Sequence, residues 1–465
     1  MFGRRRSLSG RKERSVKPIL LFFVILVIAV PLIWLFFVRM EGTAPIVEFE
    51  SEPFFIGSSS TDLTVTIKDS RSGIRKVWMG IIAGDREVEV LQQNFPSGGF
   101  FVGGKEKSVR VTAQISPEEL GLADGKAVLK IEARDYSLRH WGKGNPGSLE
   151  KEIEIDTTPP SIRMVSRAHN IAQGGAGLVI YRLAETCPKS GVMVGEEFYP
   201  GYGGYFSDPT IHLAFFAMDY RADKTTRITI TAQDAAGNQS SATIAAHILP
   251  KTFRKDSINL SDSFLSHKMP DFERFFPELA KGEPLELFLA VNQELRDKDD
   301  AAVAAITTQT EKNILWEGPF LRLPGSADRA QFADSRTYYY GGKIVDHQHH
   351  MGIDLASTTH AQIPAANHGK VVFAGDQGIY GNTVIIDHGF GLMSLYSHMS
   401  HIEVAVGDSV QKGHIIGRTG ATGMAGGDHL HYTTLVHHTF TNPIEWWDPA
   451  WIKNNITSKI EEVGP

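Results

Sequence analysis

The C-terminal part of this chain contains two informative stretches, His429-Leu430-His431-Tyr432 and His350-Met351-Gly352-Ile353-Asp354. Alternate residues of a strand face the same side, so a strand at 429–432 would present both histidines together and turn Leu430 into a core. His350 and Asp354 would likewise share one face of a strand. Gly352 and the β-branched Ile353 favour a strand or loop over a helix. The two stretches therefore predict β structure that gathers polar side chains on one face.

These side chains are typical of metal ligands. Residues 331–465 contain 13 of the 18 histidines of the chain, and such enrichment indicates metal binding. His350, Asp354 and one of the pair His429 and His431 would supply three protein ligands. Three ligands leave a fourth tetrahedral position for water, which is typical of catalytic zinc. The remaining histidines, with His398 as a further candidate, would orient that water, move protons or stabilise an oxyanion.

More motifs surround these residues in a fixed order. They are Phe332-x-Asp334-x-Arg336, 381–389 (GNTVIIDHG), Tyr396-Ser397-His398, 406–413 (VGDSVQKG), 416–423 (IGRTGATG) and Asn442-Pro443. With the two stretches above, they cover about residues 330–450. This segment resembles the lysostaphin/LytM-type zinc metallopeptidases, which cut peptidoglycan cross-bridges.

The resemblance implies a role for each of five residues. His350, Asp354 and His431 are expected to bind zinc, and His398 and His429 to act as the catalytic pair around the bound water and the developing oxyanion. Which of the two histidines is the base stays open. The family fold implies an open antiparallel β domain with a groove between loops. Two positions depart from the family pattern: the loop 424–428 and Thr433. Neither belongs to the expected metal ligands, so the departures bear on substrate preference rather than on activity.

An apolar run near the N-terminus predicts a membrane segment. Residues 19–38 contain no charged or polar side chain, and 20 helical residues span about 30 Å, the thickness of a bilayer's hydrocarbon core. The basic segment 1–18 would stay in the cytoplasm. No small-residue cleavage site follows Val38, so we expect an uncleaved signal anchor rather than a signal peptide. The chain would then be a single-pass protein of the inner (cytoplasmic) membrane with an extracytoplasmic, periplasmic catalytic domain.

Charge and cysteine content exclude other classes. The net charge is −6, but residues 1–18 carry seven basic residues and one acid, which leaves 40 basic and 52 acidic residues. An acidic body of this kind argues against nucleic acid as a partner. The one cysteine, Cys187, excludes an intrachain disulfide and cysteine-based zinc motifs.

The segment between the apolar run and the histidine-rich region predicts two related modules. Thr43-Ala44-Pro45-Ile46 and 157–162 (TTPPSI) open them alike, and alternating runs such as 63–67 predict half-buried strands. These modules resemble bacterial immunoglobulin-like domains. The apolar spacing of 283–296 and the alanines of 299–310 predict helices that connect the modules to the C-terminal domain.

We therefore expect a mostly β chain with seven segments. They are a cytoplasmic segment (1–18), a transmembrane anchor (19–38), two β-sandwich modules (42–157 and 158–249), a helical connector (250–330), a LytM-type peptidase domain (331–452) and a tail (453–465). Among the remaining side chains, Trp446 is expected in the core, whereas His437 and His438 are expected in solvent.

The leading hypothesis is a membrane-anchored zinc metalloendopeptidase that acts on peptidoglycan peptides. The alternative is a non-catalytic or autoinhibited protein of the same fold that scaffolds or activates other cell-wall hydrolases. A degenerate member would lack one of the five site residues, and none is missing. A third interpretation, a biotinyl or lipoyl carrier at 406–416, lacks a lysine at a hairpin tip. The bond cut, gating by the connector, the oligomeric state and envelope protein partners are not specified by the sequence.

Overall fold

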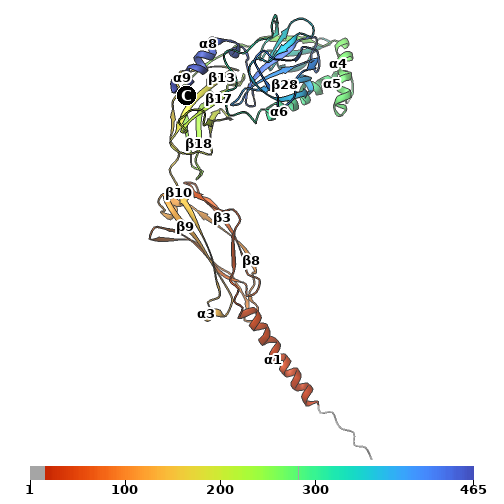
Figure 1. Ribbon diagram of the computed structural model, residues 1–465. Coiled ribbons are helices and arrows are strands. Elements are labelled where there is room, and N and C mark those ends of the chain that lie inside the picture. The colour runs from red at the N-terminus through yellow and green to blue at the C-terminus, as the bar shows by residue number, and fades with distance from the viewer. Residues whose placement is uncertain (1–15, 281, 465) are drawn as a thin grey trace, which may run out of the picture. The chain divides into compact units, whose positions relative to one another are not determined.

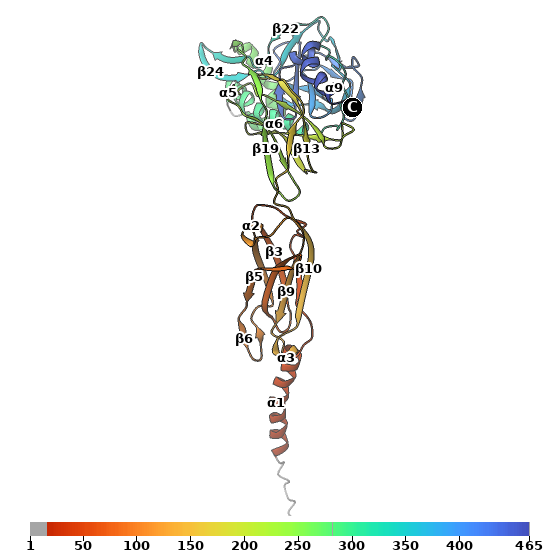
Figure 2. The same cartoon turned by 90° about the vertical axis from the view of Figure 1, so that its left-hand side faces the viewer.

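The computed structural model describes residues 16–280 and 282–464 (Figure 1). Its contacts divide the chain into two compact units, which we call the N-terminal unit (Met1–Thr158 with Ala235–Asn238) and the C-terminal unit (Pro159–Asp234 with Gln239–Pro465). Both units consist mainly of strands, and one long helix stands at the N-terminal end (Figure 2). The prediction of a mostly β chain with an N-terminal apolar helix is confirmed. Of the predicted segment 1–18, residues 1–15 lie outside the described residues.

The long helix is α1 (Lys17–Arg39). A proline stands in its first turn, where a missing amide hydrogen costs nothing, and Pro31 lies inside it. Its most apolar 18-residue window has a mean hydropathy of 3.2 and is not buried by the rest of the chain. Length and composition allow this helix to cross a membrane, and a signal sequence has the same properties.

The N-terminal unit contains a three-stranded and a five-stranded sheet among its described residues. The first has the order β1 (Ile46–Phe49), β3 (Thr61–Lys68), β8 (Ser108–Ile115); the second has the order β2 (Phe55–Ile56), β10 (Pro146–Ile155), β9 (Gly125–Asp135), β4 (Ile74–Ala83), β5 (Arg86–Asn94). Leu63, Val65 and Ile67 alternate into the core, as the period of this run predicts. One apolar cluster joins side chains of both sheets. A hairpin of β6 (Ser97–Gly99) and β7 (Gly103–Gly104) and two short helices, α2 (Pro117–Leu120) and α3 (Arg139–Gly142), complete the unit.

Residues 159–234 and 239–249 of the C-terminal unit form two four-stranded sheets and one two-stranded sheet. Their orders are β11 (Ile162–Met164), β13 (Ala176–Leu183), β17 (Ile211–Ala217), β16 (Tyr202–Gly203); β15 (Glu197–Pro200), β14 (Lys189–Val194), β18 (Ile228–Gln233), β19 (Gln239–Thr243); and β12 (His169–Ala172), β20 (Ala246–Leu249). Their apolar side chains belong to the same cluster as those of the C-terminal domain. The Tyr199 hydroxyl, for example, lies 2.7 Å from Thr439 Oγ1. The segment predicted as the second module therefore shares its core with the C-terminal domain.

The predicted connector, 250–330, is helical only in its middle. The helices are α4 (Asp262–Phe275), α5 (Pro284–Ala290), a π-helical turn (Val291–Leu295) and α6 (Arg296–Ile306). Strand β21 (Lys255–Asn259) precedes them and pairs in parallel with β23 (Ser335–Tyr340), which also pairs with β24 (Lys343–His349). Strand β22 (Ala327–Ala330) follows them and joins the large sheet of the C-terminal domain. The predicted helical connector therefore has a strand at each end.

The described C-terminal domain is built on an eight-stranded sheet. Seven strands follow the order β22, β25 (Ile353–Ala356), β33 (Leu430–Val436), β29 (Leu392–Ser397), β28 (Asn382–Asp387), β27 (Gly369–Asp376), β31 (Ser409–Val410), and β34 (Thr439–Thr441) pairs with β33. A smaller sheet has the order β26 (Gln362–Pro364), β32 (Ile415–Arg418), β30 (His401–Ile402). Every residue of β33 is buried, because it lies between β25 and β29 with both faces covered.

The C-terminal segment is part of the core, which corrects the prediction of a tail at 453–465. It contains α7 (Ile444–Trp447), α8 (Pro449–Ile452), a π-helical turn (Lys453–Thr457) and α9 (Ser458–Val463). Ile456 is fully buried. Trp446 is buried among aromatic rings of distant segments, as predicted for the core. His437 is buried against Tyr202 rather than exposed to solvent.

A buried carboxyl in this segment makes stability depend on pH. Oε2 of Glu445 accepts a 2.8 Å hydrogen bond from the Ala176 amide, and burial raises the pKa of Glu445 to about 8 from its ordinary 4.5. Because the fold favours the protonated form, the stabilisation is full below about pH 4.5 and is lost as the pH rises toward 8. We expect Glu445→Gln to raise the free energy of unfolding by roughly 2–4 kcal/mol near pH 8.5 and by under about 1 kcal/mol near pH 5. Urea unfolding at both pH values measures this difference.

The control for this prediction is Glu461→Gln, which changes an exposed carboxyl of α9. It is expected to leave the free energy of unfolding within about 0.5 kcal/mol at both pH values. An equal gain for Glu445→Gln at both pH values would contradict the prediction.

Candidate metal centre and catalytic site

Four strands position the site. Asp354 lies in β25 and His431 in β33, where the two residues are direct partners across the antiparallel pair. Ser397 of β29 is the partner of His431 on the other side, and His398 follows it. His350 comes directly after β24, at the entry to β25. Gly352 permits this packing, since a Cβ atom there would meet the His431 ring at 2.6 Å. The strand pairing thus brings three distant segments to one point.

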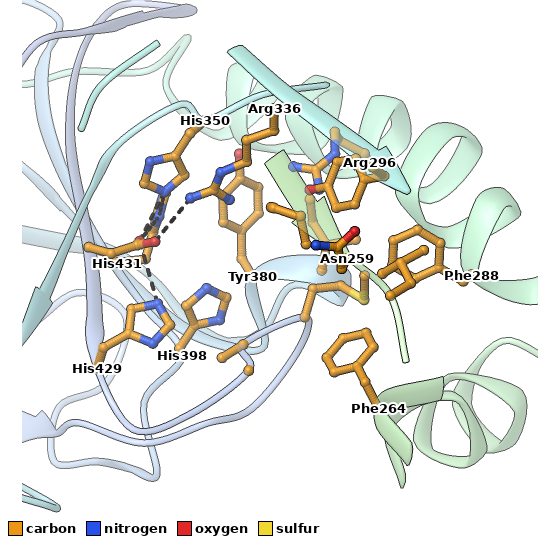
Figure 3. A pocket seen from close by; sticks show the side chains of 18 residues that line it. Asn259, Phe264, Phe288, Arg296, Arg336, His350, Tyr380, His398, His429 and His431 are labelled. Atoms are coloured by element: carbon orange, nitrogen blue, oxygen red, sulfur yellow. Dashed lines mark hydrogen bonds and ion pairs between the residues drawn. The ribbon is translucent and has the colours of Figure 1, made fainter. Parts of the chain in front are cut away.

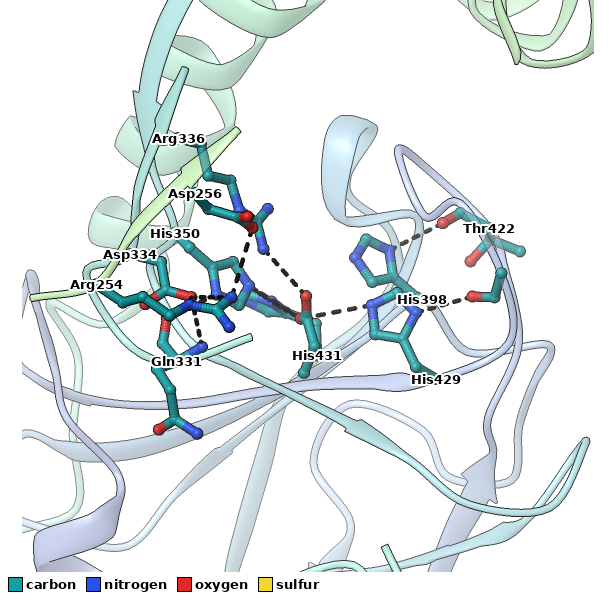
Figure 4. Close-up of polar contacts among 12 residues, drawn as sticks. Arg254, Asp256, Gln331, Asp334, Arg336, His350, His398, Thr422, His429 and His431 are labelled. Carbon is teal, nitrogen blue, oxygen red and sulfur yellow. Dashed lines mark hydrogen bonds and ion pairs between the residues drawn. The ribbon is translucent and has the colours of Figure 1, made fainter. Parts of the chain in front are cut away.

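Three side-chain atoms converge at this point (Figure 4). Nε2 of His350 lies 2.9 Å from Oδ1 of Asp354 and 2.9 Å from Nδ1 of His431. The distance between Nδ1 of His431 and Oδ1 of Asp354 is 3.0 Å. One ion bound at about 2.0–2.2 Å from each atom would fit among the three.

The protonation pattern of His350 favours a cation here. Its Nδ1 donates a 3.0 Å hydrogen bond to the carbonyl oxygen of Gln331. A neutral imidazole with its proton on Nδ1 has a lone pair on Nε2. That lone pair faces a carboxylate oxygen and a second imidazole nitrogen, so the arrangement lacks positive charge at its centre. Two imidazoles and one carboxylate are a ligand set that zinc prefers, and the residues present fit this ion.

Neighbouring side chains hold the three ligands in place. Nη2 of Arg336 donates to Oδ2 of Asp354 at 3.2 Å. Asp334 accepts from the backbone amide of Gln331 at 2.9 Å and pairs with Arg254 at 2.9 Å, which fixes the carbonyl bound by His350. Such outer contacts orient metal ligands.

The two other predicted histidines lie beside the convergent atoms. Nδ1 of His398 donates to the carbonyl of Thr422 at 2.9 Å, and Nδ1 of His429 donates to the carbonyl of Gly427 at 2.8 Å. The two rings are 4.9 Å apart between centroids. Nε2 of His429 lies 3.4 Å from Oδ1 of Asp354. Each Nδ1 is therefore occupied by a carbonyl, which leaves Nε2 as the atom that can exchange a proton.

His398 is held in an unusual state. Its φ angle is +63°, in the left-handed region that non-glycine residues seldom adopt. Burial and then the charges of His429 and His431 lower the pKa of His398 well below its ordinary value. The ring is therefore neutral at neutral pH and has a lone pair on Nε2. Backbone strain combined with a shifted pKa is characteristic of functional sites.

The histidines open onto a cavity of about 360 Å³ that has two walls (Figure 3). One wall carries the five site residues with Tyr380 and Met424. The other comes from the connector: Asn259, Phe264, Phe288 and Arg296. The apolar spacing of 283–296 predicts that this helix buries one face, but it does not indicate that this face lines the site. Arg296 and the two phenylalanines are functional candidates that the sequence analysis missed.

The connector wall is fixed to the C-terminal domain by polar contacts. Asp299 accepts from the Ile379 amide at 2.7 Å, and Asp300 accepts from the Tyr380 hydroxyl at 2.6 Å. Nζ of Lys268 donates to the carbonyl of Ala421 at 2.7 Å. These contacts fix the loop that contains Ile379 and Tyr380 and the loop that contains Ala421. The connector is therefore an integral side of the cavity.

All five predicted site residues meet at this cavity. The other histidines of the region do not join them: His349 packs on Tyr220, and His388 is buried against Phe320. Nε2 of His431 has no hydrogen-bond partner among the described residues.

Comparisons with known proteins locate the similarity in this domain. The model of Peptidase family M23 matches residues 348–443. The chain is 39% identical over 95 residues to DD-carboxypeptidase/endopeptidase Mpg of Neisseria meningitidis serogroup B, covering 20% of this chain and 22% of that protein. It is 25% identical over 158 residues to the murein hydrolase activator EnvC of Escherichia coli, covering 33% and 38%. The chain thus spans between about a fifth and two fifths of these relatives.

Among solved structures, the catalytic domain of the antimicrobial peptidase lysostaphin from Staphylococcus simulans is 28% identical. The match covers 28% of this chain and 98% of that domain, with a TM-score of 0.24.

Proposed function

We propose that this chain, which carries a peptidase M23 domain at residues 348–443, is a zinc metalloendopeptidase that hydrolyses peptide cross-links of peptidoglycan. One observation carries the proposal: the converging lone pairs of His350, Asp354 and His431 share a cavity with two further histidines. The relative Mpg is named a DD-carboxypeptidase/endopeptidase, which supports a peptide substrate of this class.

The residues divide the chemistry among them. When bound, zinc would lower the pKa of a water molecule and polarise the carbonyl group of the substrate. His398 and His429 then hold or move protons at Nε2, because a carbonyl fixes each Nδ1. Arg336 keeps Asp354 oriented toward the histidines. The cavity wall formed by Phe264 and Phe288 would exclude water from one side of the bound peptide.

The proposal places the enzyme at a membrane. Helix α1 would anchor the chain in the cytoplasmic membrane with the N-terminus inside the cell and the C-terminal unit outside it. The apolar run and the basic residues before it support this orientation. Peptidoglycan would be met on that outer side.

The second candidate function is activation of other hydrolases. The match to a protein named murein hydrolase activator supports it. The complete set of five polar residues around one cavity favours catalysis, since a purely scaffolding protein has no need of converging metal ligands.

The test uses the full chain, solubilised in detergent, with purified peptidoglycan. We expect new peptide ends by mass spectrometry, their loss after treatment with a zinc chelator, and their return on adding zinc. Zinc content per chain is measured in the same samples. A folded chain that holds one zinc ion and releases no peptide would contradict the proposal and favour the activator.

A further inference from the structure

Two loops of the N-terminal unit expose apolar side chains next to the end of α1. Phe100, Phe101 and Val102 form the tip of the β6–β7 hairpin and are 60%, 51% and 50% exposed. Trp141 in α3 is fully exposed. Adjacent exposed apolar side chains such as those at the hairpin tip mark an interaction surface.

These loops are attached to α1 by hydrogen bonds. Nε1 of Trp34 donates to the carbonyl of Phe101 at 3.3 Å. Arg39 donates to the carbonyls of Gly99 and Phe100 and, through Nε, to that of Tyr136. The Leu138 amide donates to the Arg39 carbonyl at 2.6 Å. Arg39 is buried in this cluster, so the last turn of α1 belongs to the fold of the N-terminal unit (Figure 2).

The contacts set the depth of the hairpin relative to the helix. Trp34 precedes Arg39 by five residues, or about 7.5 Å along the helix axis. The interfacial layer on each side of the hydrocarbon core is about 5–8 Å thick. If α1 spans a bilayer with residues 19–38 in the hydrocarbon core, Phe101 lies beside the last turns of the helix, at the boundary between the acyl chains and the headgroups.

The composition of both loops suits this level. Residues 97–104 contain no charged side chain, while Arg139, His140 and Lys143 flank Trp141. Trp and Phe are favoured at the boundary between headgroups and acyl chains, and basic side chains attract anionic headgroups. His140 and Trp141 have φ angles of +51° and +59°. This left-handed backbone is strained for both residues, yet it holds the indole away from the unit.

We propose that Phe100, Phe101, Val102 and Trp141 insert into the outer surface of the same bilayer that α1 crosses. The N-terminal unit then lies on the membrane surface, and its two loops are held against the end of the helix. We assign lipid as the binding partner of these side chains because hydrogen bonds hold both loops against the end of the membrane-spanning helix. The inference rests on the membrane anchor of the proposed function and is independent of peptide hydrolysis.

The test measures the depth of spin labels on the full chain. In a Cys187→Ser background, nitroxide labels are placed by Phe101→Cys or Trp141→Cys, and the chain is reconstituted in liposomes of phosphatidylethanolamine and phosphatidylglycerol. Collisions with oxygen report lipid, and collisions with a water-soluble nickel chelate report solvent. We expect labels at 101 and 141 to favour oxygen at least about threefold more than the label of Glu118→Cys, on exposed α2.

An Ile28→Cys label, in the middle of α1, reports insertion of the helix. Lipid contact at 28 combined with solvent exposure at 101 and 141 would overturn the inference alone. Solvent exposure at 28 would overturn the anchor and the inference together. Labels at 101 and 141 that are shielded from both reagents would indicate a protein partner instead and would also overturn it.

Discussion

The Asp354→Asn variant is expected to bind zinc at least about 100-fold more weakly than the wild type and to release no peptide from peptidoglycan. Asp354 is the one anionic member of the converging triad, and its Oδ1 lies within 3.0 Å of both imidazole nitrogens. An amide removes this charge and leaves Arg336 without its carboxylate partner. Loss even of an outer contact to a metal ligand weakens binding by about 10–100-fold, so loss of the ligand itself should exceed that range. Competition with a chromophoric chelator measures the affinity.

The matched control is Asp297→Asn, which makes the same chemical change on the exposed surface of α6. It is expected to keep wild-type zinc affinity and peptide release. Wild-type zinc affinity in Asp354→Asn would show that the triad is not the metal site.

The His398→Asn variant is expected to keep its zinc and to lose about 10²–10⁴-fold in kcat, the range for a residue that transfers a proton. His398 lies outside the triad, so the metal ligands stay intact. Asparagine tolerates the left-handed backbone at this position but cannot accept the proton that a neutral imidazole accepts. Zinc stoichiometry and initial rates of peptide release, measured on the same sample, separate the two effects.

His401→Asn serves as the control, because His401 is an exposed histidine three residues away in β30. It should leave both zinc and rate unchanged. If His398→Asn lost zinc in proportion to activity, His398 would be part of the metal site rather than a proton-transferring group.

The residue types and their order along the chain were informative about the site, whereas the predicted strand alternation was only partly correct. Asp354 and His431 lie in strands, but His350 lies between β24 and β25 and His429 directly precedes β33. What alternation cannot supply is the register that sets Asp354 opposite His431. Only the family resemblance selected His431 over His429 as the third ligand.

The connector shows where such reasoning ends. The apolar spacing of 283–296 predicts a buried helical face, and the helix is present. The partner of that face depends on contacts between residues far apart in the chain, such as the rings of Phe288 and Tyr338, whose centroids are 5.6 Å apart. A pattern within one helix contains no information about them.

The second module begins where it was predicted, but it shares its core with the C-terminal domain, for a related reason. Composition and proline pairs mark changes along the chain, whereas a domain is defined by its core. Tyr199 and Thr439 are 240 residues apart and share one hydrogen bond inside a continuous core. His437 was expected in solvent because histidine is polar, yet Tyr202 from the same distant segment covers it. Lys459, equally polar, is buried beside His169.

The two-walled cavity bears on inhibitor design. A compound with a metal-chelating head and an aromatic tail would place the head among His350, Asp354 and His431 and the tail against Phe264 and Phe288. The head would bind a metal site of a kind that many zinc peptidases share. The tail would address side chains outside residues 348–443, the segment matched by the family model. Selectivity for this protein would therefore come from its connector, and a screen run on the isolated peptidase domain would overlook it.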